Sequence, residues 1–178
     1  LNSNGTLDTT FNPGMGVDKA VKITKIQSDG KIIIGGDFTS YNGTTRNGIA
    51  RLNTNGTLDT SFNPGTGANG SITTISIQSD GKIIVGGMFT YYNGTIINKI
   101  ARLNTNGTLD TTFNPGSELN YNVSTTSIQS DGKIIVGIIF YTNLTGNDNY
   151  WITRRNTNGS LDNSFAAPFN PWGLGSTG

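Results

Sequence analysis

A unit of 51 residues recurs along the chain, and this repeat constrains the fold more than any other feature of the sequence. Residues 1–51 align with residues 52–102 without a gap and are identical at 33 of 51 positions. The run Asp-Gly-Lys begins at Asp29, Asp80 and Asp131, and the third unit carries one inserted residue. Units of this length cannot bury a core alone and stack on one another. The chain is therefore predicted to be a tandem array.

Each unit reads as four short strands, predicted in the second copy at residues 72–78, 82–89, 99–103 and 109–113. Asn, Gly, Thr and Ile are frequent, which suits strands joined by tight turns. The Asp-Gly between the first two strands predicts a type I′ hairpin turn. The apolar run at residues 82–89 predicts burial on both faces of the sheet. Four antiparallel strands in about 50 residues are typical of a β-propeller blade, with a solenoid as the main alternative.

The predicted fold class is all-β, a propeller of four-stranded antiparallel blades that belongs to a larger ring or to one completed by an oligomer. Three repeats are fewer than the usual four to eight blades. We expect a natural C-terminus and an N-terminus cut from a longer array. Ile138, Trp151 and Arg155 depart from the repeat, so the last blade is expected to be atypical. The predicted parts are the end of a preceding blade at 1–16, blades at 17–65, 66–116 and 117–165, and a Gly/Pro-rich tail at 166–178.

The repeated residues also resemble a known family. The motif runs Arg51-Leu52-Asn53-x-Asn55-Gly56-x-Leu58-Asp59, then Ile77-Gln78-x-Asp80-Gly81-Lys82, then Gly86-Gly87-x-Phe89-Thr90. In this motif the chain is similar to the bacterial delta-60 repeat family, over essentially residues 1–165. The resemblance implies a β-propeller of uncharacterised function, in large secreted, surface or phage-associated proteins. It implies no catalytic residues.

The loops at the two ends of a blade differ in how much they vary between copies. The turns after the first and third strands are nearly constant, whereas the loops after the second and fourth strands change strongly. Loops on a rigid scaffold are common sites of recognition. We therefore expect the variable loops to form the binding face, and the alternative is that their aromatic residues pack between blades. The candidate ligand-binding residues are Tyr41, Arg46, Tyr92, Tyr121, Tyr150 and Trp151.

Catalysis, metals and cofactors are not expected. The chain has no Cys and no His, which removes the commonest nucleophile–base pairs and metal ligands. Seven of its carboxylates belong to repeating turns and are expected to stay solvated, and Asp37 stands alone. The run Asn53-x-Asn55-Gly56-x-x-Asp59 resembles a calcium loop only weakly, because one carboxylate stands where such loops use several. Asn side chains that bond their own turn explain it better.

The sequence favours a non-catalytic binding or adhesion module at the cell surface or outside the cell, with a glycan or a protein as ligand. The alternative is a structural spacer or assembly subunit of a surface filament, a secretion-associated complex or a phage appendage, which would place it in a virion. Its expected partners also include other blades of the same protein or a homo-oligomer. The net charge of +1, with scattered Lys and Arg, argues against nucleic acid. No run of 18 apolar residues exists, so direct membrane insertion is not expected.

Overall fold

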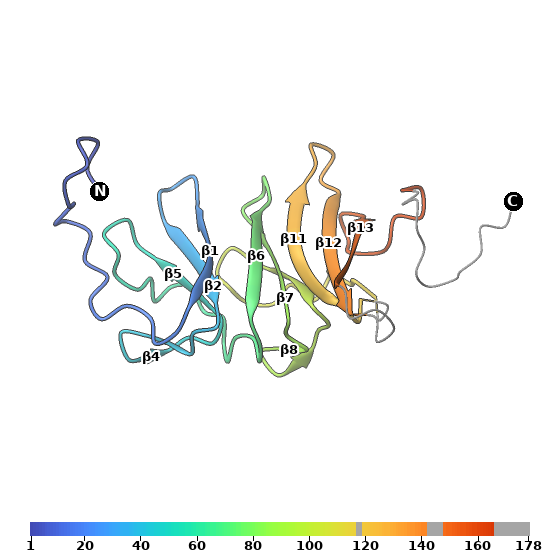
Figure 1. Cartoon of the computed structure of the whole chain (residues 1–178), viewed down its shortest axis with the longest axis horizontal. Helices are drawn as coiled ribbons and strands as arrows, with labels where there is room; N and C mark the ends of the chain where they lie inside the picture. The colour runs from blue at the N-terminus through green and yellow to red at the C-terminus, as the bar shows by residue number, and fades with distance from the viewer. Residues whose placement is uncertain (117–118, 142–147, 166–178) are drawn as a thin grey trace, which may run out of the picture.

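The computed structural model describes residues 1–116, 119–141 and 148–165. The regular elements in these ranges are β-strands, so the all-β prediction is confirmed. Nine of these strands form three antiparallel sheets of three strands each, which lie side by side as an open row (Figure 1). The sheets consist of β1 (Val21–Ile26), β2 (Ile32–Gly36) and β5 (Ile49–Leu52); β6 (Ile72–Ile77), β7 (Ile83–Gly87) and β10 (Ile100–Leu103); and β11 (Asn122–Ile128), β12 (Ile134–Tyr141) and β13 (Asp148–Arg155). Within these ranges there is no helix suited to crossing a membrane.

The three sheets share one topology, and we call each of them, with the segment that follows it, a blade. In every blade the second strand in sequence is the middle strand of the sheet. Between β2 and β5 the chain forms a small extra hairpin, and the same happens in the second blade. These hairpins are β3 (Ser40–Tyr41) with β4 (Thr44–Thr45), and β8 (Tyr91–Tyr92) with β9 (Thr95–Ile96).

The four-stranded sheet predicted for each blade is wrong in its last strand. The segment expected as a fourth strand contributes one isolated bridge to the third strand, Leu52 with Leu58 in the first blade and Leu103 with Leu109 in the second. Asp59 N donates to the Arg51 carbonyl at 2.8 Å, and the chain then turns at Phe62. The segment after the third strand, which we call the D segment, therefore lies beside the sheet without extending its ladder.

The predicted type I′ turn after the first strand is also wrong. Gly30 has φ 78°, but Asp29 is not left-handed. Gln27 N donates to the Lys31 carbonyl, and Gly30 N donates to the Gln27 carbonyl. This is the longer hairpin connection, in which one glycine supplies the positive φ. The type I′ pattern occurs instead at Asn42-Gly43, with φ values of 47° and 74°.

The core lies between neighbouring sheets, as the apolar run of the second strand predicts. Every residue of β7 is buried. Ile83 and Val85 belong to the cluster shared with the first blade, whereas Ile84 belongs to the cluster shared with the third. Because side chains alternate along a strand, one sheet can supply two interfaces at once. A middle blade is consequently stabilised from both sides.

The third blade is atypical, as predicted, and a lost glycine explains part of the difference. A Cβ at Gly87 would lie 2.0 Å from the Ser71 carbonyl oxygen, so only glycine fits there. Ile138 occupies the matching position of the third blade and pairs with Val123. The chain continues in β12 through this point. Arg155, in place of a leucine, is buried and donates to the Pro115 carbonyl at 2.9 Å.

The connections of each blade gather at two ends. At one end, which we call the turn end, the hairpin turn at Gly30 contacts Thr54 of the turn after β5. At the other, which we call the loop end, the β3–β4 hairpin meets the segment that enters β1, with a bridge between Val17 and Tyr41. Figure 1 shows the turns between β1 and β2, β6 and β7, and β11 and β12 on one side, and β4 and β8 on the opposite side. This matches the predicted pairing of loops.

Candidate functional site

The loop end is held rigid by polar side chains at repeated positions. Asn42 N donates to the Gly16 carbonyl, and the Asn42 amide donates to the Pro13 carbonyl at 2.9 Å. Asp18 Oδ1 accepts from Thr39 N at 2.7 Å and from Ser40 N at 2.9 Å. Asn69 does the same work in the second blade, where its Oδ1 accepts from the Thr90 and Tyr91 amides. The two loops of the first blade, and those of the second, are therefore fixed to each other before any ligand arrives.

Two of the predicted ligand-binding residues lie in the core. Tyr41 and Tyr92 are both buried. Tyr41 Oη donates to the Gly56 carbonyl at 2.6 Å, and Tyr92 Oη donates to the Gly107 carbonyl at 3.2 Å. Burial raises the pKa of the Tyr92 hydroxyl strongly. Their assignment to the binding face is corrected, because these rings fill the space between hairpin and D segment and offer no surface to a ligand.

The other four candidates fall on two different blades. Arg46 is half-buried, and its Nη1 donates to the neighbouring Thr45 carbonyl at 2.8 Å. Tyr121 and Trp151 pack against the core of the third blade, whereas Tyr150 is 71% exposed. Ile139 of β12 pairs with Asn122 on one side and with Tyr150 on the other, so Tyr121 and Tyr150 flank the same end of that blade. The loop at 142–147 lies outside the described residues.

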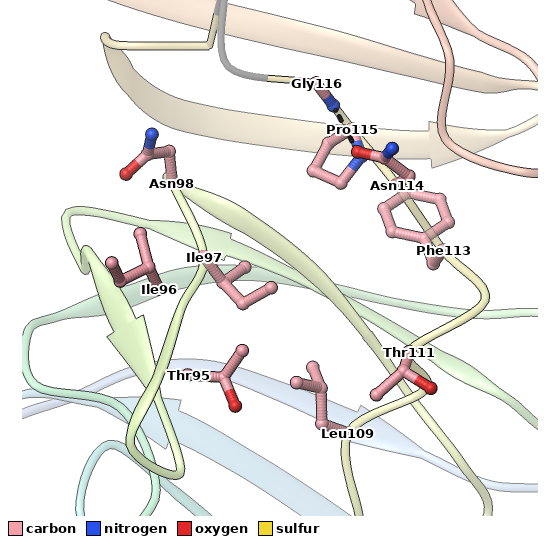
Figure 2. Close-up of a pocket in the computed structure, with 10 residues that line it drawn as sticks. All are labelled: Thr95, Ile96, Ile97, Asn98, Leu109, Thr111, Phe113, Asn114, Pro115 and Gly116. Atoms are coloured by element: carbon pink, nitrogen blue, oxygen red, sulfur yellow. Dashed lines mark hydrogen bonds between the residues drawn. The ribbon is translucent and has the colours of Figure 1, made fainter.

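A hollow of about 620 Å³ opens at the loop end of the second blade, between its hairpin and its D segment. Figure 2 shows Ile96 and Ile97 on the hairpin side, with Leu109 between them and the opposite wall. Ile96 is 69% exposed. The residues that line the hollow are Thr95, Ile96, Ile97, Asn98, Leu109, Thr111, Phe113, Asn114, Pro115 and Gly116.

The hollow joins an apolar wall to a polar rim. Ile96, Ile97 and Leu109 provide the wall, and hydroxyl and amide groups surround it. Asn114 Oδ1 accepts from Gly116 N at 3.0 Å, which fixes the far rim as a turn (Figure 2). A pocket with few polar groups around an apolar floor is typical of a recognition site. The candidate list from the sequence missed it; the available signal was Ile96-Ile97 in place of Thr45-Arg46.

A second, polar hollow of about 370 Å³ lies between the first and second blades. Its wall includes Asp37, one of the carboxylates outside the repeating turns. Lys22 Nζ lies 3.0 Å from Asp37 Oδ1 and donates to Ser71 Oγ at 3.1 Å. Hydrogen bonding from Ser71, followed by that from Lys22, lowers the pKa of Asp37. Asp37 is thus an ionised partner of Lys22 in its own blade, and Ser71 of the next blade bonds to both.

The aspartates of the D segments are not solvated turn residues, contrary to expectation. Asp59 and Asp110 are buried. Asp59 Oδ2 lies 2.7 Å from Arg51 Nε and 2.9 Å from Lys31 Nζ. Burial alone would raise the pKa of Asp59, but hydrogen bonds from Lys31, Ser61 and Arg51 outweigh it and lower the pKa well below the usual range. We call this Arg–Asp–Lys group the ion triad; it recurs with Asp110 and Asp162.

The ion triads predict how stability depends on pH. A lowered folded pKa means that the unfolded chain binds more protons below about pH 5, so stability rises with pH in that range. The contribution is complete above the unfolded pKa of about 3.9 and is lost as pH falls through the folded values. The chain has no His, so the free energy of unfolding is expected to be flat from about pH 5 to 8 and to fall below about pH 4. Urea unfolding across pH checks this; a midpoint that moves between pH 6 and 7 would contradict it.

The run that resembles a calcium loop uses its oxygen atoms internally. Asn55 Oδ1 accepts from Thr57 N at 3.1 Å and from Thr57 Oγ1 at 2.7 Å. Asp59 belongs to the ion triad described above. Within the described ranges no cluster of three acidic side chains suited to a metal ion occurs.

Comparison with known proteins gives one family and no curated relative. A family model described as "Domain of unknown function (DUF5122) beta-propeller" matches residues 27–62, 78–113 and 129–165. The three matches together cover more than half of the sequence and begin one repeat length apart. They confirm the propeller repeat and the expected resemblance. No curated protein matches the chain.

Proposed function

Because the chain belongs to the DUF5122 β-propeller family, whose function is unknown, we propose that it is a non-catalytic module that binds a protein ligand at the loop end of its second blade. The observation that carries the proposal is the hollow beside Ile96 and Leu109. Ile96 is mostly exposed and lies beside a preformed apolar floor, and together they form a surface suited to bind an apolar side chain of a ligand. The rim amides and hydroxyls suit the polar backbone of such a ligand.

A protein ligand fits the hollow better than a sugar does. Sugars are held by exposed aromatic rings together with amides, and the two rings expected on the first and second blades, Tyr41 and Tyr92, are buried. The walls of the hollow are aliphatic, apart from the buried Phe113. One observation favours a glycan elsewhere: Tyr150, which is exposed at the same end of the third blade as Tyr121. A glycan site there is the second candidate.

The state of the carboxylates supports a role without catalysis. Asp18, Asp37, Asp59 and Asp110 each accept hydrogen bonds that lower their pKa. A general acid at neutral pH needs a raised pKa, and a general base needs a free lone pair near its substrate. Groups that are ionised and committed to neighbouring donors meet neither requirement. The extracellular, surface or virion location stays a prediction.

The test uses a selected ligand and a pair of matched variants. Peptides selected from a displayed library against the intact chain are expected to lose at least about tenfold in affinity with Ile96→Asp, because the charge would be desolvated in the contact. Thr45→Asp, the matching change on the first blade, is expected to leave affinity unchanged. Biolayer interferometry measures both. Peptides that bind Ile96→Asp as tightly as the parent chain would refute the site.

A glycan array with the same proteins separates the second candidate. A glycan that binds the parent chain and Ile96→Asp equally, and is lost with Tyr150→Ala, would move the binding site to the third blade. Because Ile96 and Tyr150 are both exposed, neither change is expected to disturb folding.

A further inference from the structure

Neighbouring blades meet through a knob and a hole that repeat at every joint. A Cβ added to Gly86 of β7 would lie 2.6 Å from Val123 Cγ1 of β11, so the valine fills the space that glycine leaves. Ile72 fills the space over Gly35 of β2 in the same way, at 2.9 Å. Ile72 and Val123 are fully buried as a result. The knob always comes from the first strand of a blade, and the hole from the middle strand of the blade before it.

A second set of contacts ties the turn end of each blade to the blade before it. Arg51 Nη1 donates to the Thr105 carbonyl at 2.7 Å, and Arg102 Nη1 donates to the Thr157 carbonyl at 2.6 Å. The ring that ends each D segment packs on a glycine of the following blade, as Phe113 does at Gly159. Donor and ring belong to the earlier blade, and the carbonyl and glycine belong to the later one.

The first blade has the same first strand, turn carbonyl and turn glycine that the second and third blades use to bind the blade before them. We call this side of a blade its accepting face, and in the first blade part of it is exposed. Val21 stands at the position of Ile72 and Val123, yet it is 42% exposed, and four more residues of β1 are exposed. The Thr54 carbonyl, which matches those of Thr105 and Thr157, has no hydrogen-bond donor among the described residues. The accepting face of the first blade is therefore formed but incompletely covered.

The third blade presents the complementary half. Gly137 stands at the position of Gly35 and Gly86, and the described atoms nearest to a Cβ there belong to Ser124 and Thr125 of its own sheet. Arg154 forms its ion triad, but its Nη1 has no acceptor among the described residues, unlike Arg51 and Arg102. The Phe165 ring lies 4.9 Å from the Arg154 guanidinium, as in the other blades, and is only half-buried.

One segment of the chain already occupies a corner of the accepting face. Phe11 packs at Gly56, and Asn12 N donates to the Asn55 carbonyl at 2.7 Å. This contact is the weakest of its kind, because Phe11 is 37% exposed whereas Phe62 and Phe113 are buried. Residues 1–12 make two of the contacts of the joint, whereas a complete blade would make all of them.

We propose that a second copy of this chain docks its third blade on the first blade, in place of residues 1–12. Val21 enters the hole at Gly137, Arg154 Nη1 donates to the Thr54 carbonyl, and Phe165 replaces Phe11 at Gly56. Two copies joined in this way at both ends close a ring of six blades, within the range of four to eight that propellers use. Head-to-tail contacts that close in this way saturate every edge. A second copy is the expected partner, because the new joint would repeat the contacts of the two joints between blades within the chain.

The experiment is sedimentation equilibrium on the intact chain and two matched phenylalanine variants. The parent chain is expected to be a dimer at micromolar concentration. Phe165→Ala removes the ring that would enter the joint and is expected to weaken association of the two copies at least about tenfold. Phe11→Ala weakens the binding of residues 1–12 to the same face and is expected to strengthen association of the two copies about tenfold. A parent chain that is monomeric at all concentrations, or variants that shift association in the same direction, would overturn the proposal.

A mixing experiment tests the head-to-tail geometry independently. Val21→Asp blocks the accepting face alone, and Phe165→Ala weakens the donating face alone. At a concentration below its own dissociation constant, each variant is expected to be monomeric, and it is expected to be folded by circular dichroism. Mixed together, they retain one intact joint and are expected to give a 1:1 heterodimer. Failure to form it, with both variants folded and the parent chain dimeric, would show that the dimer uses another surface.

Discussion

Asp110→Asn is expected to lower the free energy of unfolding by about 3 kcal/mol, although it changes neither the size nor the shape of the side chain. Asp110 Oδ2 lies 2.8 Å from Arg102 Nε and 2.8 Å from Lys82 Nζ, and Asp110 is buried. Removing the carboxylate leaves the buried guanidinium without its counter-charge. The value stands at the low end of the range for a broken buried ion pair, because Lys82 is about one-third exposed and can turn to solvent.

Asp80→Asn in the same blade is the matched control for this measurement. Asp80 is exposed in the hairpin turn and accepts a hydrogen bond from Lys82 N at 3.0 Å, which an amide oxygen can also accept. Its effect is expected to stay within about 0.5 kcal/mol. Urea unfolding at pH 7 measures both. Equal effects of the two substitutions would mean that the ion triad adds nothing to stability.

Phe62→Ala is expected to cost about 3–5 kcal/mol, since it removes a fully buried ring from the joint between two blades. The ring lies 4.9 Å from the Arg51 guanidinium and packs on Gly107 of the second blade. The smaller alanine side chain leaves a cavity between the first and second blades. Unfolding of the first blade ahead of the second, seen as a broadened transition, is expected with it, because repeat arrays are coupled only through such interfaces.

Phe11→Ala is the comparison at the same place in the motif. Phe11 is partly exposed, so its loss is expected to cost about 1 kcal/mol or less. Both proteins are compared at one concentration, because association would add to apparent stability. A small effect at Phe62 would show that the joint collapses without penalty and is not the source of blade stability.

The sequence predicted the repeat, its strands and its two ends because each depends on local patterns. The apolar run at residues 82–89 indicated burial on both faces, and the turn glycines marked the hairpins. The prediction of a fourth strand was wrong because Leu58 and Leu109 each form a single bridge to the third strand. The next residues, Asp59 and Asp110, then turn inward to their ion triads. Local pattern does not reveal which aspartate is buried; that depends on Arg51 and Arg102 in the adjacent strand.

The hollow lies at the end of the blades where the sequence predicted the binding face, but its lining residues are not the predicted ones. Tyr41 and Tyr92 were chosen as loop aromatics, yet each ring reaches the carbonyl of a turn 15 residues away and is buried there. Whether a ring faces solvent depends on how the β3–β4 and β8–β9 hairpins fold back on the D segment. The hollow at Ile96 combines residues 95–98 with residues 109–116, a pairing that only the folded blade creates.

The accepting half of each joint contains carbonyl oxygens and a glycine, as at Thr105, Asn106 and Gly107. Apart from the glycine, these contacts fall on main-chain atoms, which are the same in every residue. Amino-acid changes at Thr105 or Asn106 therefore leave these contacts at the turn end intact, whereas the side chains of Ile72 and Val123 have to be kept. Gene duplication or deletion of whole 51-residue units can lengthen or shorten such a protein without a new interface having to evolve.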